Sequence, residues 1–170
     1  MNSFINFDDL FWETIDQTCN ISNGNILKQK ELLEKELEKF DSQHLILFHL
    51  RFSELRLQAY QWNTWLAYET IIKETNEDDF YNFREWIIMQ GKNNYYSILE
   101  NPDLLVNAKK EDIIIAIEIL ETIGYLPKKI LEAKGIIHSI HFQSEIPGDD
   151  WADQNILAKD LLPNLWRKYN

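Results

Sequence analysis

The sequence predicts a single compact all-α domain over residues 1–170, with about six to eight helices packed around one long central helix. Three observations support this fold class. A chain of 170 residues fits one domain, because domains commonly hold about 100–150 residues. Hydrophobic residues make up 45% of the chain and six are tryptophans, which is enough to fill a core. Five glycines and four prolines are too few for the many turns of a β-sandwich or barrel.

The N-terminal part predicts two helices. The first begins at Asp8 or Asp9, whose side chains can accept a hydrogen bond from a free backbone N–H, and it ends near Cys19. A turn that contains Gly24 follows. A second, charged helix is expected over 28–40, where alternating Glu and Lys residues are typical of a solvated face.

Residues 42–74 carry the most regular apolar pattern, and they predict the long central helix. Seven apolar residues recur at intervals of three and four, which places them on one helical face. They are Leu45, Phe48, Phe52, Leu55, Ala59, Trp62 and Leu66. Asp41 or Ser42 can cap the start of this helix.

A further helix is expected between Asn76 and Gly91, because Phe80 and Phe83 share a face and a glycine suits the left-handed position that ends a helix. A short helix follows, and Pro102 stops it.

The remaining segments are less regular. Residues 109–123 are rich in isoleucine, so that both a helix and a strand remain open, although their length favours a helix that ends at Gly124. Pro127 can open the next helix. Residues 153–169 predict a C-terminal helix that Pro163 bends.

The charge of the chain excludes some partners and favours others. The formal net charge is −11 and the isoelectric point is about 4.8. Binding to DNA, RNA or an anionic membrane depends on lysines and arginines, and here only the pairs at 128–129 and 167–168 stand together. We therefore expect no direct nucleic-acid or membrane partner. A basic protein partner is favoured, because opposite charges steer association.

The cellular location follows from what the chain lacks. Cys19 is the one cysteine, so an internal disulfide is impossible. The N-terminus has no basic region followed by an apolar core, and the longest apolar run, 113–117, is far shorter than the ~20 residues that span a bilayer. The chain is expected to be cytoplasmic.

Residues 76–105 contain the candidate site, and they allow two interpretations. In the first, Arg84 and the neighbouring aspartates bind a phosphate or carboxylate ligand. The residues of that site would be Trp62, Asp78, Asp79, Arg84, Trp86 and Tyr95. In the second, the aspartates cap a helix and Arg84 pairs with Asp79, Asp103 or another acid, while the rings fill a core. The central core residues would then be Trp62, Phe83, Trp86, Ile87 and Leu99. We prefer the second interpretation.

Other candidate chemistry is weaker. Asp-Asp occurs at 8–9, 78–79 and 149–150, where capping explains the positions better than a Mg²⁺ cluster does. His138 and His141, with Glu145 and Asp149 beyond, fall short of a convincing zinc ligand set. Cys19 occupies an apolar helical position, which favours a core role over a nucleophile. The common catalytic motifs are absent from the sequence, and we expect no cofactor and no bound metal.

Four stretches together resemble one family. They are FWETID at 11–16, AYQWNTWLAY at 59–68, residues 76–105, and GDDWADQNILAKDLLPNLWRKY at 148–169. The order is similar to that in the bacterial domain-of-unknown-function family 4240, some of whose members are labelled molybdenum metabolism regulator and occur beside WGR domains. The family pattern often has Gly-Gly-Cys-Ser before the aspartate pair, where this chain has 73–77, and residues 109–140 match no such pattern. The resemblance implies no defined activity.

Three functional hypotheses remain. The first is a non-catalytic, acidic, cytoplasmic protein-binding module, of which an immunity-type protein that neutralises a basic bacterial toxin is one version. The second is a small-molecule or phosphate-binding protein, or an enzyme, that uses Asp78, Asp79 and Arg84. The third, implied by the resemblance alone, is a regulatory or DNA-repair accessory domain. We favour the first.

Overall fold

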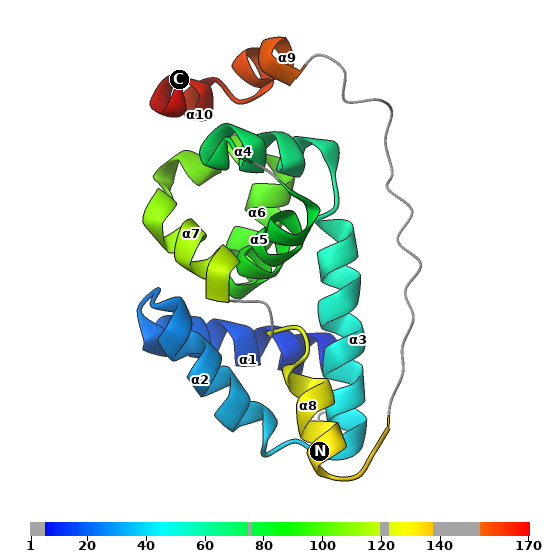
Figure 1. The fold of residues 1–170 in the computed structure, drawn as a ribbon. Coiled ribbons are helices and arrows are strands. Elements are labelled where there is room, and N and C mark those ends of the chain that lie inside the picture. The colour runs from blue at the N-terminus through cyan, green and yellow to red at the C-terminus, as the bar shows by residue number, and fades with distance from the viewer. Residues whose placement is uncertain (1–5, 75, 120–122, 138–153) are drawn as a thin grey trace.

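The computed structural model describes residues 6–74, 76–119, 123–137 and 154–170, and every regular element in these ranges is a helix (Figure 1). The elements are α1 (Phe7–Ser22), α2 (Ile26–Leu37), α3 (Ser42–Gln58), α4 (Trp62–Ile72), α5 (Glu77–Met89), α6 (Lys92–Glu100), the 3₁₀ helix η1 (Pro102–Asn107), α7 (Lys110–Ile119), α8 (Leu126–Ala133), α9 (Gln154–Leu161) and α10 (Pro163–Tyr169). The all-α prediction is confirmed, and residues 110–119 form a helix rather than a strand. Within these ranges no helix combines the length and apolar character that crossing a membrane requires.

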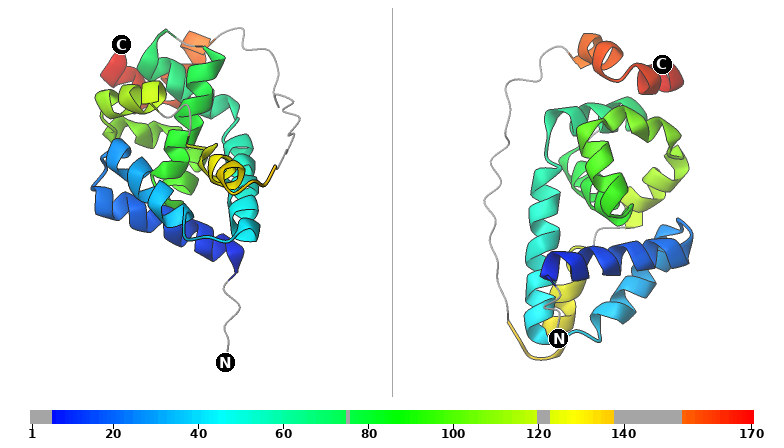
Figure 2. Two further views of the ribbon diagram at one scale, coloured as in Figure 1. Left: turned by 60° about the horizontal axis from the view of Figure 1, so that its bottom comes forward. Right: turned by 180° about the vertical axis from the view of Figure 1, so that it is seen from behind.

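Helix α3 runs along one side of the molecule rather than through its centre (Figures 1 and 2). Helices α1, α2 and α8 lie at one end of α3, and helices α4 to α7 lie at the other. Helices α9 and α10 pack on α4, at the end opposite α2 and α8. This arrangement brings α5 and α7 together, although η1 and α6 separate them in the sequence.

The long central helix predicted over 42–74 is wrong, because the structure divides it into α3 and α4. The chain turns at Ala59–Gln61, where the N–H of Tyr60 donates to Leu57 O over 3.0 Å and Gln61 is extended. Tyr60, which falls off the apolar stripe, is buried at 7% exposure. The interval of three between Ala59 and Trp62 is typical of a continuous helix, so the pattern hides the break.

Among the described helices, most of the N-caps that make a side-chain hydrogen bond are asparagines. The side chains of Asn6, Asn25 and Asn76 accept N–H groups at the starts of α1, α2 and α5. Asp41 caps α3 as predicted, and its side chain accepts from the N–H of His44 over 2.8 Å. The aspartates of the pairs 8–9 and 78–79 were expected to cap helices. They lie instead in the first turn, where a negative charge complements the helix dipole. The pair 149–150 lies outside the described residues.

The most buried helix is α5. Every residue from 82 to 89 in it is buried, including the polar side chains of Asn82, Arg84 and Glu85. Phe83 and Ile87 are fully enclosed and Trp86 is 5% exposed, as expected for core residues, while Trp62 and Leu99 are half-buried. A helix that is apolar or buried on all sides is surrounded by others. Helices α1, α3, α4, α6 and α7 all contact α5.

The C-terminal helix α10 is fixed to the body by a buried carboxylate. Asp103, in η1, accepts hydrogen bonds from the backbone N–H groups of Asn164, at 3.1 Å, and Leu165, at 2.8 Å. Its Oδ2 also accepts from Nδ2 of Asn164 over 2.7 Å. At the other end of the contact, Nζ of Lys168 donates to the carbonyl oxygens of Val106 and Ala108. The single bent helix predicted over 153–169 is instead two helices in the described residues, because α9 ends at Leu161 and Pro163 is the first residue of α10.

Candidate functional site

A pocket of about 480 Å³ lies between α5, α7 and the segment that precedes α8. Its lining residues are Asp78, Asp79, Tyr81, Asn82, Ile117, Glu118 and Tyr125. The volume lies in the range of about 300–1,000 Å³ that is common for ligand sites. Three of the lining residues are acidic, two carry phenol rings, and none is basic.

The first turn of α5 positions the two aspartates. Asn76 and Asp79 bond to each other in both directions: the N–H of Asp79 donates to Oδ1 of Asn76 over 2.8 Å, and Nδ2 of Asn76 donates to Oδ2 of Asp79 over 2.7 Å. The first bond caps the helix and the second joins the two side chains, and together they fix the start of α5. Asp78 and Asn82 are four residues apart and therefore share a face of α5.

One buried amide joins the two helices that form the pocket. Nδ2 of Asn82 donates to the carbonyl oxygen of Ile117 over 2.9 Å. Asn82 is 8% exposed, and a hydrogen bond made there is costly to break because its partner would be left unpaired. The bond sets the register of α7 against α5, so that Glu118 reaches the same opening as Asp78.

A buried ion pair lies behind the pocket. Nη1 of Arg56 lies 2.9 Å from Oε1 of Glu85, which is 1% exposed. The guanidinium carbon of Arg56 also lies 4.1 Å from the ring centroid of Tyr81. The π-face of an aromatic ring attracts a cation in this position. Burial raises the pKa of Tyr81, and the charge of Glu85 adds to the rise. Tyr81 therefore presents a neutral ring to the pocket at neutral pH.

The same carboxylate positions the third side of the pocket. The backbone N–H of Gly124 donates to Oε2 of Glu85 over 3.1 Å, and Nδ1 of His49 donates to the carbonyl oxygen of Gly124 over 3.0 Å. Burial raises the pKa of Glu85, while the charge of Arg56 opposes the rise. Because Gly124 is held on both its polar groups, the neighbouring Tyr125 has a defined place in the pocket lining.

Arg84 is not among the residues that line the pocket, although it was a candidate ligand-binding residue. Its Nε donates to the carbonyl oxygen of Phe80 and its Nη1 to that of Arg56. The guanidinium carbon lies 4.3 Å from the ring centroid of Tyr60. Burial and the charge of Arg56 lower the pKa of Arg84 to about 10, which leaves it charged at neutral pH.

The expected pairing of Arg84 with Asp79 or Asp103 is therefore wrong. Asp79 bonds to Asn76, and Asp103 bonds to Asn164 and Leu165. The carboxylate of Asp79 bonds to the side chain of Asn76 and that of Asp103 accepts from the start of α10, while Arg84 bonds to backbone carbonyls.

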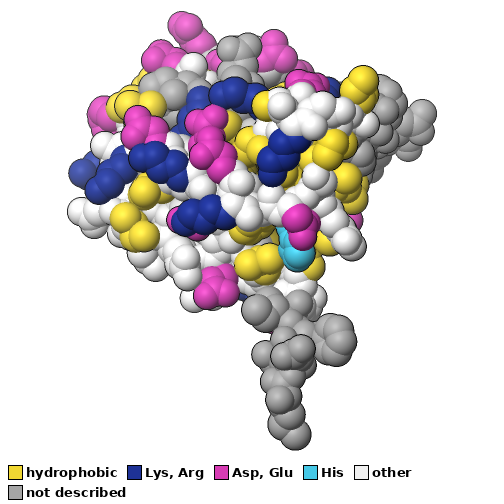
Figure 3. Space-filling model, turned by 90° about the horizontal axis from the view of Figure 1, so that it is seen from below, with side chains coloured by type: hydrophobic (Ala, Val, Ile, Leu, Met, Phe, Trp, Pro, Cys, Tyr) yellow, Lys and Arg dark blue, Asp and Glu magenta, His cyan; other side chains and the backbone are white. Residues whose placement is uncertain are grey.

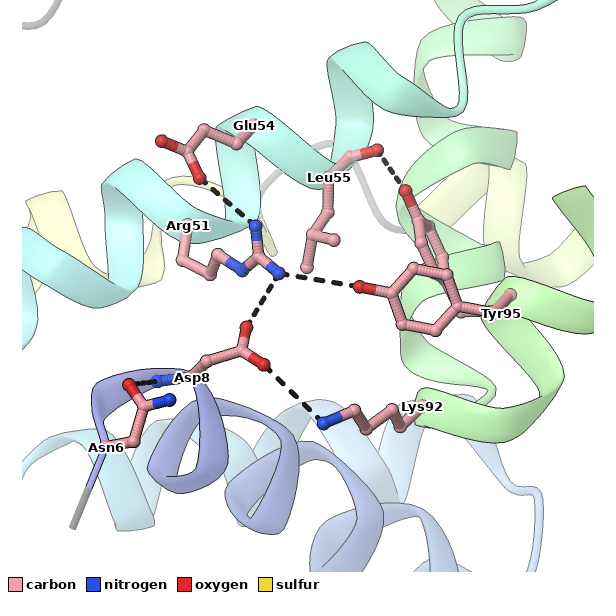
Figure 4. A network of polar contacts seen from close by, with 8 residues as sticks. Asn6, Asp8, Arg51, Glu54, Leu55, Lys92 and Tyr95 are labelled. Atoms are coloured by element: carbon pink, nitrogen blue, oxygen red, sulfur yellow. Dashed lines mark hydrogen bonds and ion pairs between the residues drawn. The ribbon is translucent and has the colours of Figure 1, made fainter.

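The other predicted site residues lie apart from the pocket. The hydroxyl of Tyr95 donates to the carbonyl oxygen of Leu55 over 2.6 Å (Figure 4). Trp86 lies in the core and lines a different pocket, and Trp62 is half-buried at the start of α4. Asp78 and Asp79 are thus the predicted residues that the structure brings together in this opening.

Asp8 has a structural partner on each of two other helices (Figure 4). Its Oδ1 lies 2.6 Å from Nη2 of Arg51 in α3, and its Oδ2 lies 3.5 Å from Nζ of Lys92 in α6. Arg51 also pairs with Glu54 over 3.2 Å. The network ties α1, α3 and α6 together, because Arg51 and Lys92 both form ion pairs with the carboxylate of Asp8.

Metal and nucleophile chemistry find little support in the described part of the chain. No three His, Cys, Asp or Glu side chains converge there in a way that could hold a metal ion. His138, His141, Glu145 and Asp149 lie outside the described residues. Cys19 is half-buried, and burial together with the charge of Asp16 raises the pKa of its thiol, which makes it a poorer nucleophile.

A family model matches most of the chain. The model of a family described as "Protein of unknown function (DUF4240)" matches residues 8–130. The matched range contains all the residues that line the pocket. It includes 109–130, where no family pattern was expected, and it does not reach the resembling stretch at 148–169 or helices α9 and α10. No curated protein and no solved structure matches the chain.

Proposed function

The chain belongs to the DUF4240 family of proteins of unknown function, and from this premise we propose that it is a non-catalytic binding module of the cytoplasm. In this proposal the pocket between α5 and α7 receives a lysine or arginine side chain from a basic segment of another protein. The observation that carries the proposal is the lining of the pocket: three acidic side chains, two tyrosine rings and no basic residue.

The lining suits a long cationic side chain. Asp78, Asp79 and Glu118 offer carboxylates near the opening, and Tyr81 and Tyr125 line it with phenol rings. Both rings already attract a cation of the protein, since the guanidinium carbon of Arg56 lies 4.1 Å from the ring centroid of Tyr81 and Nζ of Lys128 lies 5.9 Å from that of Tyr125. A ligand cation gains from the carboxylates and the rings, because it pairs with a carboxylate and is attracted to an aromatic face by about 0.5–2 kcal/mol. A phosphate or carboxylate ligand would be repelled by these three carboxylates. Arg84 does not offset the repulsion, because it donates to backbone carbonyls outside the lining.

Exposed apolar residues beside the pocket favour a protein partner over a free amine. Ile114 lies one turn before Ile117 and Glu118 on α7, so it shares their face. Ile114 is 37% exposed and Tyr125 is 51% exposed. A peptide that places one basic side chain in the pocket could cover these residues with its neighbours, as central anchors in protein interfaces do.

The charge distribution also favours the pocket between α5 and α7 over another face of the molecule as the binding site for a basic partner. The face over α1, α2 and α8 carries lysines and arginines interspersed with acidic side chains (Figure 3). In α2 alone, Lys28, Lys30 and Lys35 alternate with Glu31 and Glu34. A basic partner therefore meets both signs of charge there, whereas the pocket presents one sign.

A basic secreted toxin is one specific partner class. In that version the chain is an immunity-type protein that covers the basic surface of a toxin such as a nuclease. The formal charge of −11 supports it, because a strongly acidic protein associates quickly with a basic one. Co-expression with a basic toxin encoded beside its gene tests this version, and survival of the host cell is the expected result.

The pocket itself is tested by binding of a fluorescent octa-arginine peptide, with octa-glutamate as the control peptide. We expect the double variant Asp78→Asn/Glu118→Gln to weaken arginine-peptide binding about tenfold, the loss of about 1.4 kcal/mol. The matched variant Glu111→Gln/Asp112→Asn removes the same charge from exposed positions of α7 outside the lining. Equal weakening by both variants would show that net charge alone attracts the peptide and would overturn the proposed pocket.

A further inference from the structure

A second pocket, of about 390 Å³, lies where η1 faces the end of α5 and the helix α6. Its lining residues are Trp86, Gln90, Asn94, Ser97, Ile98, Leu104, Leu105, Asn107 and Ala108. None of these residues carries a charge, in contrast to the acidic pocket between α5 and α7. An ion placed here would lose its hydration without gaining a counter-charge, so the lining selects against charged ligands.

The polar part of this lining consists mainly of carboxamides whose nitrogens are already bonded. Nε2 of Gln90 donates to Trp86 O over 3.1 Å, and Nδ2 of Asn94 donates to Gln90 O over 2.9 Å. Nδ2 of Asn107 donates to Leu104 O over 3.3 Å. In each case the nitrogen faces a backbone carbonyl, so the side-chain oxygen faces away from it and can accept a hydrogen bond from a ligand.

The rest of the lining is apolar and mostly buried, with Trp86 at 5% exposure and Leu105 at 2%, whereas Leu104 is 42% exposed. Trp86 stacks on Phe83 with ring centroids 5.8 Å apart, so one face of the indole is committed to the core. Ile98, Leu104 and Leu105 complete the apolar surface. A matching ligand would have hydroxyl donors around its edge and C–H groups on its face, because amide oxygens accept hydroxyl hydrogens and an apolar surface accepts C–H groups.

We propose that this pocket binds a neutral polyhydroxyl ring, of the class of a sugar or a cyclic polyol. The amides and Ser97 pair with the hydroxyl groups, and the ring lies on Leu104 over the floor that Trp86, Ile98 and Leu105 form. The wall that η1 supplies is held in place before any ligand arrives, because Asp103 and Lys168 fix η1 to α10. A preformed site avoids the cost of ordering its own side chains on binding.

Ligand-observed saturation-transfer NMR on the full chain tests the proposal. The neutral probes are D-glucose and myo-inositol, and the charged analogues are glucosamine and glucuronate. We expect saturation transfer to both neutral probes and at least threefold weaker transfer to the charged analogues. Absence of transfer to the neutral probes, or equal transfer to the charged ones, overturns the proposal.

Two substitutions on α6 locate the site. Ser97→Phe fills the pocket from an exposed position and should abolish the transfer, whereas Asn93→Phe makes a matched change at an exposed position outside the lining and should leave it intact. Asn94→Leu removes one acceptor with little change of volume and should reduce the transfer. It replaces Ser97→Phe as the test if that variant does not fold. Transfer that survives both Ser97→Phe and Asn94→Leu, or that Asn93→Phe removes equally, contradicts the site. Asp78→Asn should have no effect, which separates this pocket from the acidic one.

Discussion

The guanidinium of Arg84 completes the end of α3 by donating from Nη1 to the carbonyl oxygen of Arg56, 3.1 Å away. In a continuous helix that carbonyl would accept from the N–H of Tyr60, which instead donates to Leu57 O. The last carbonyls of a helix need partners, and a cation is favoured near them by the helix dipole. Arg84 supplies both the hydrogen-bond donor and the positive charge, and it lies in α5, 28 residues after Arg56.

Replacing this arginine should therefore destabilise the turn between α3 and α4. Arg84→Met keeps much of the side-chain volume but removes the charged hydrogen bonds to Arg56 and Phe80. We expect the free energy of unfolding to fall by about 2–3 kcal/mol, since hydrogen bonds to charged groups are worth more than neutral ones. Urea unfolding at pH 7 measures it. A loss below about 0.5 kcal/mol would contradict a capping role.

Gly124 should not accept a side chain. A methyl carbon added there would clash with Oε1 of Glu85 and lie 3.0 Å from Nη1 of Arg56. We expect Gly124→Ala to cost about 1–3 kcal/mol, as overpacking usually does, and to weaken arginine-peptide binding by displacing Tyr125.

Gly24 provides the control for that substitution. It has a φ of +78°, and a methyl carbon on it would meet nothing within 4 Å. Asn tolerates this left-handed conformation better than most residues, so Gly24→Asn should lower the thermal unfolding midpoint less than Gly124→Ala does, by the backbone strain alone. A loss at Gly124 that is no larger than the loss at Gly24 would contradict the clash with Glu85.

Asp103 should control whether α10 stays attached. Asp103→Ala removes the carboxylate that accepts from the backbone of Asn164 and Leu165. We expect hydrogen exchange in residues 163–169 to accelerate at least tenfold, while exchange in α5 remains slow, because the lost bonds hold one helix only. Asp160→Ala removes an acid from an exposed position of α9 and should leave exchange in α10 unchanged. Uniform acceleration in both helices would indicate global destabilisation instead.

Glu69 should make stability depend on pH. Burial raises the pKa of Glu69 above its ordinary value of 4.5, and its Oε2 is buried with no hydrogen-bond partner among the described residues. The folded state then binds the proton more tightly than the unfolded state does. The stability that protonated Glu69 contributes is fully present below pH 4.5 and is lost as the pH rises through the raised pKa.

Glu69→Gln removes that titration. We expect the variant to be more stable than the natural chain at pH 7, by less than about 1 kcal/mol because the side chain keeps some solvent contact. Below pH 4.5 the two should have the same stability. Urea unfolding of both chains at pH 4 and pH 7 gives the comparison. A variant that is less stable at pH 7 would mean that the carboxylate has a favourable partner.

Local chemistry made most helices predictable. Asp41 before α3, Pro163 at the start of α10 and the apolar spacing within α5 each act over a few residues, so they can be read along the chain. The turn at Ala59–Gln61 has no such local mark, because it contains neither glycine nor proline. It depends on the burial of Tyr60 and on the hydrogen bond from Arg84, both of which come from packing.

The lining of the acidic pocket was likewise predictable from the sequence only in part. Asp78, Tyr81 and Asn82 lie three and four residues apart, so helical geometry alone places them on one face of α5. Glu118 and Tyr125 join them only because Asn82 fixes α7 and Glu85 holds Gly124. The sequence by itself determined helices, their starts and an acidic surface, since propensity, capping and charge act between near neighbours. The tertiary structure alone decided which faces meet, because that depends on contacts between residues far apart in the chain.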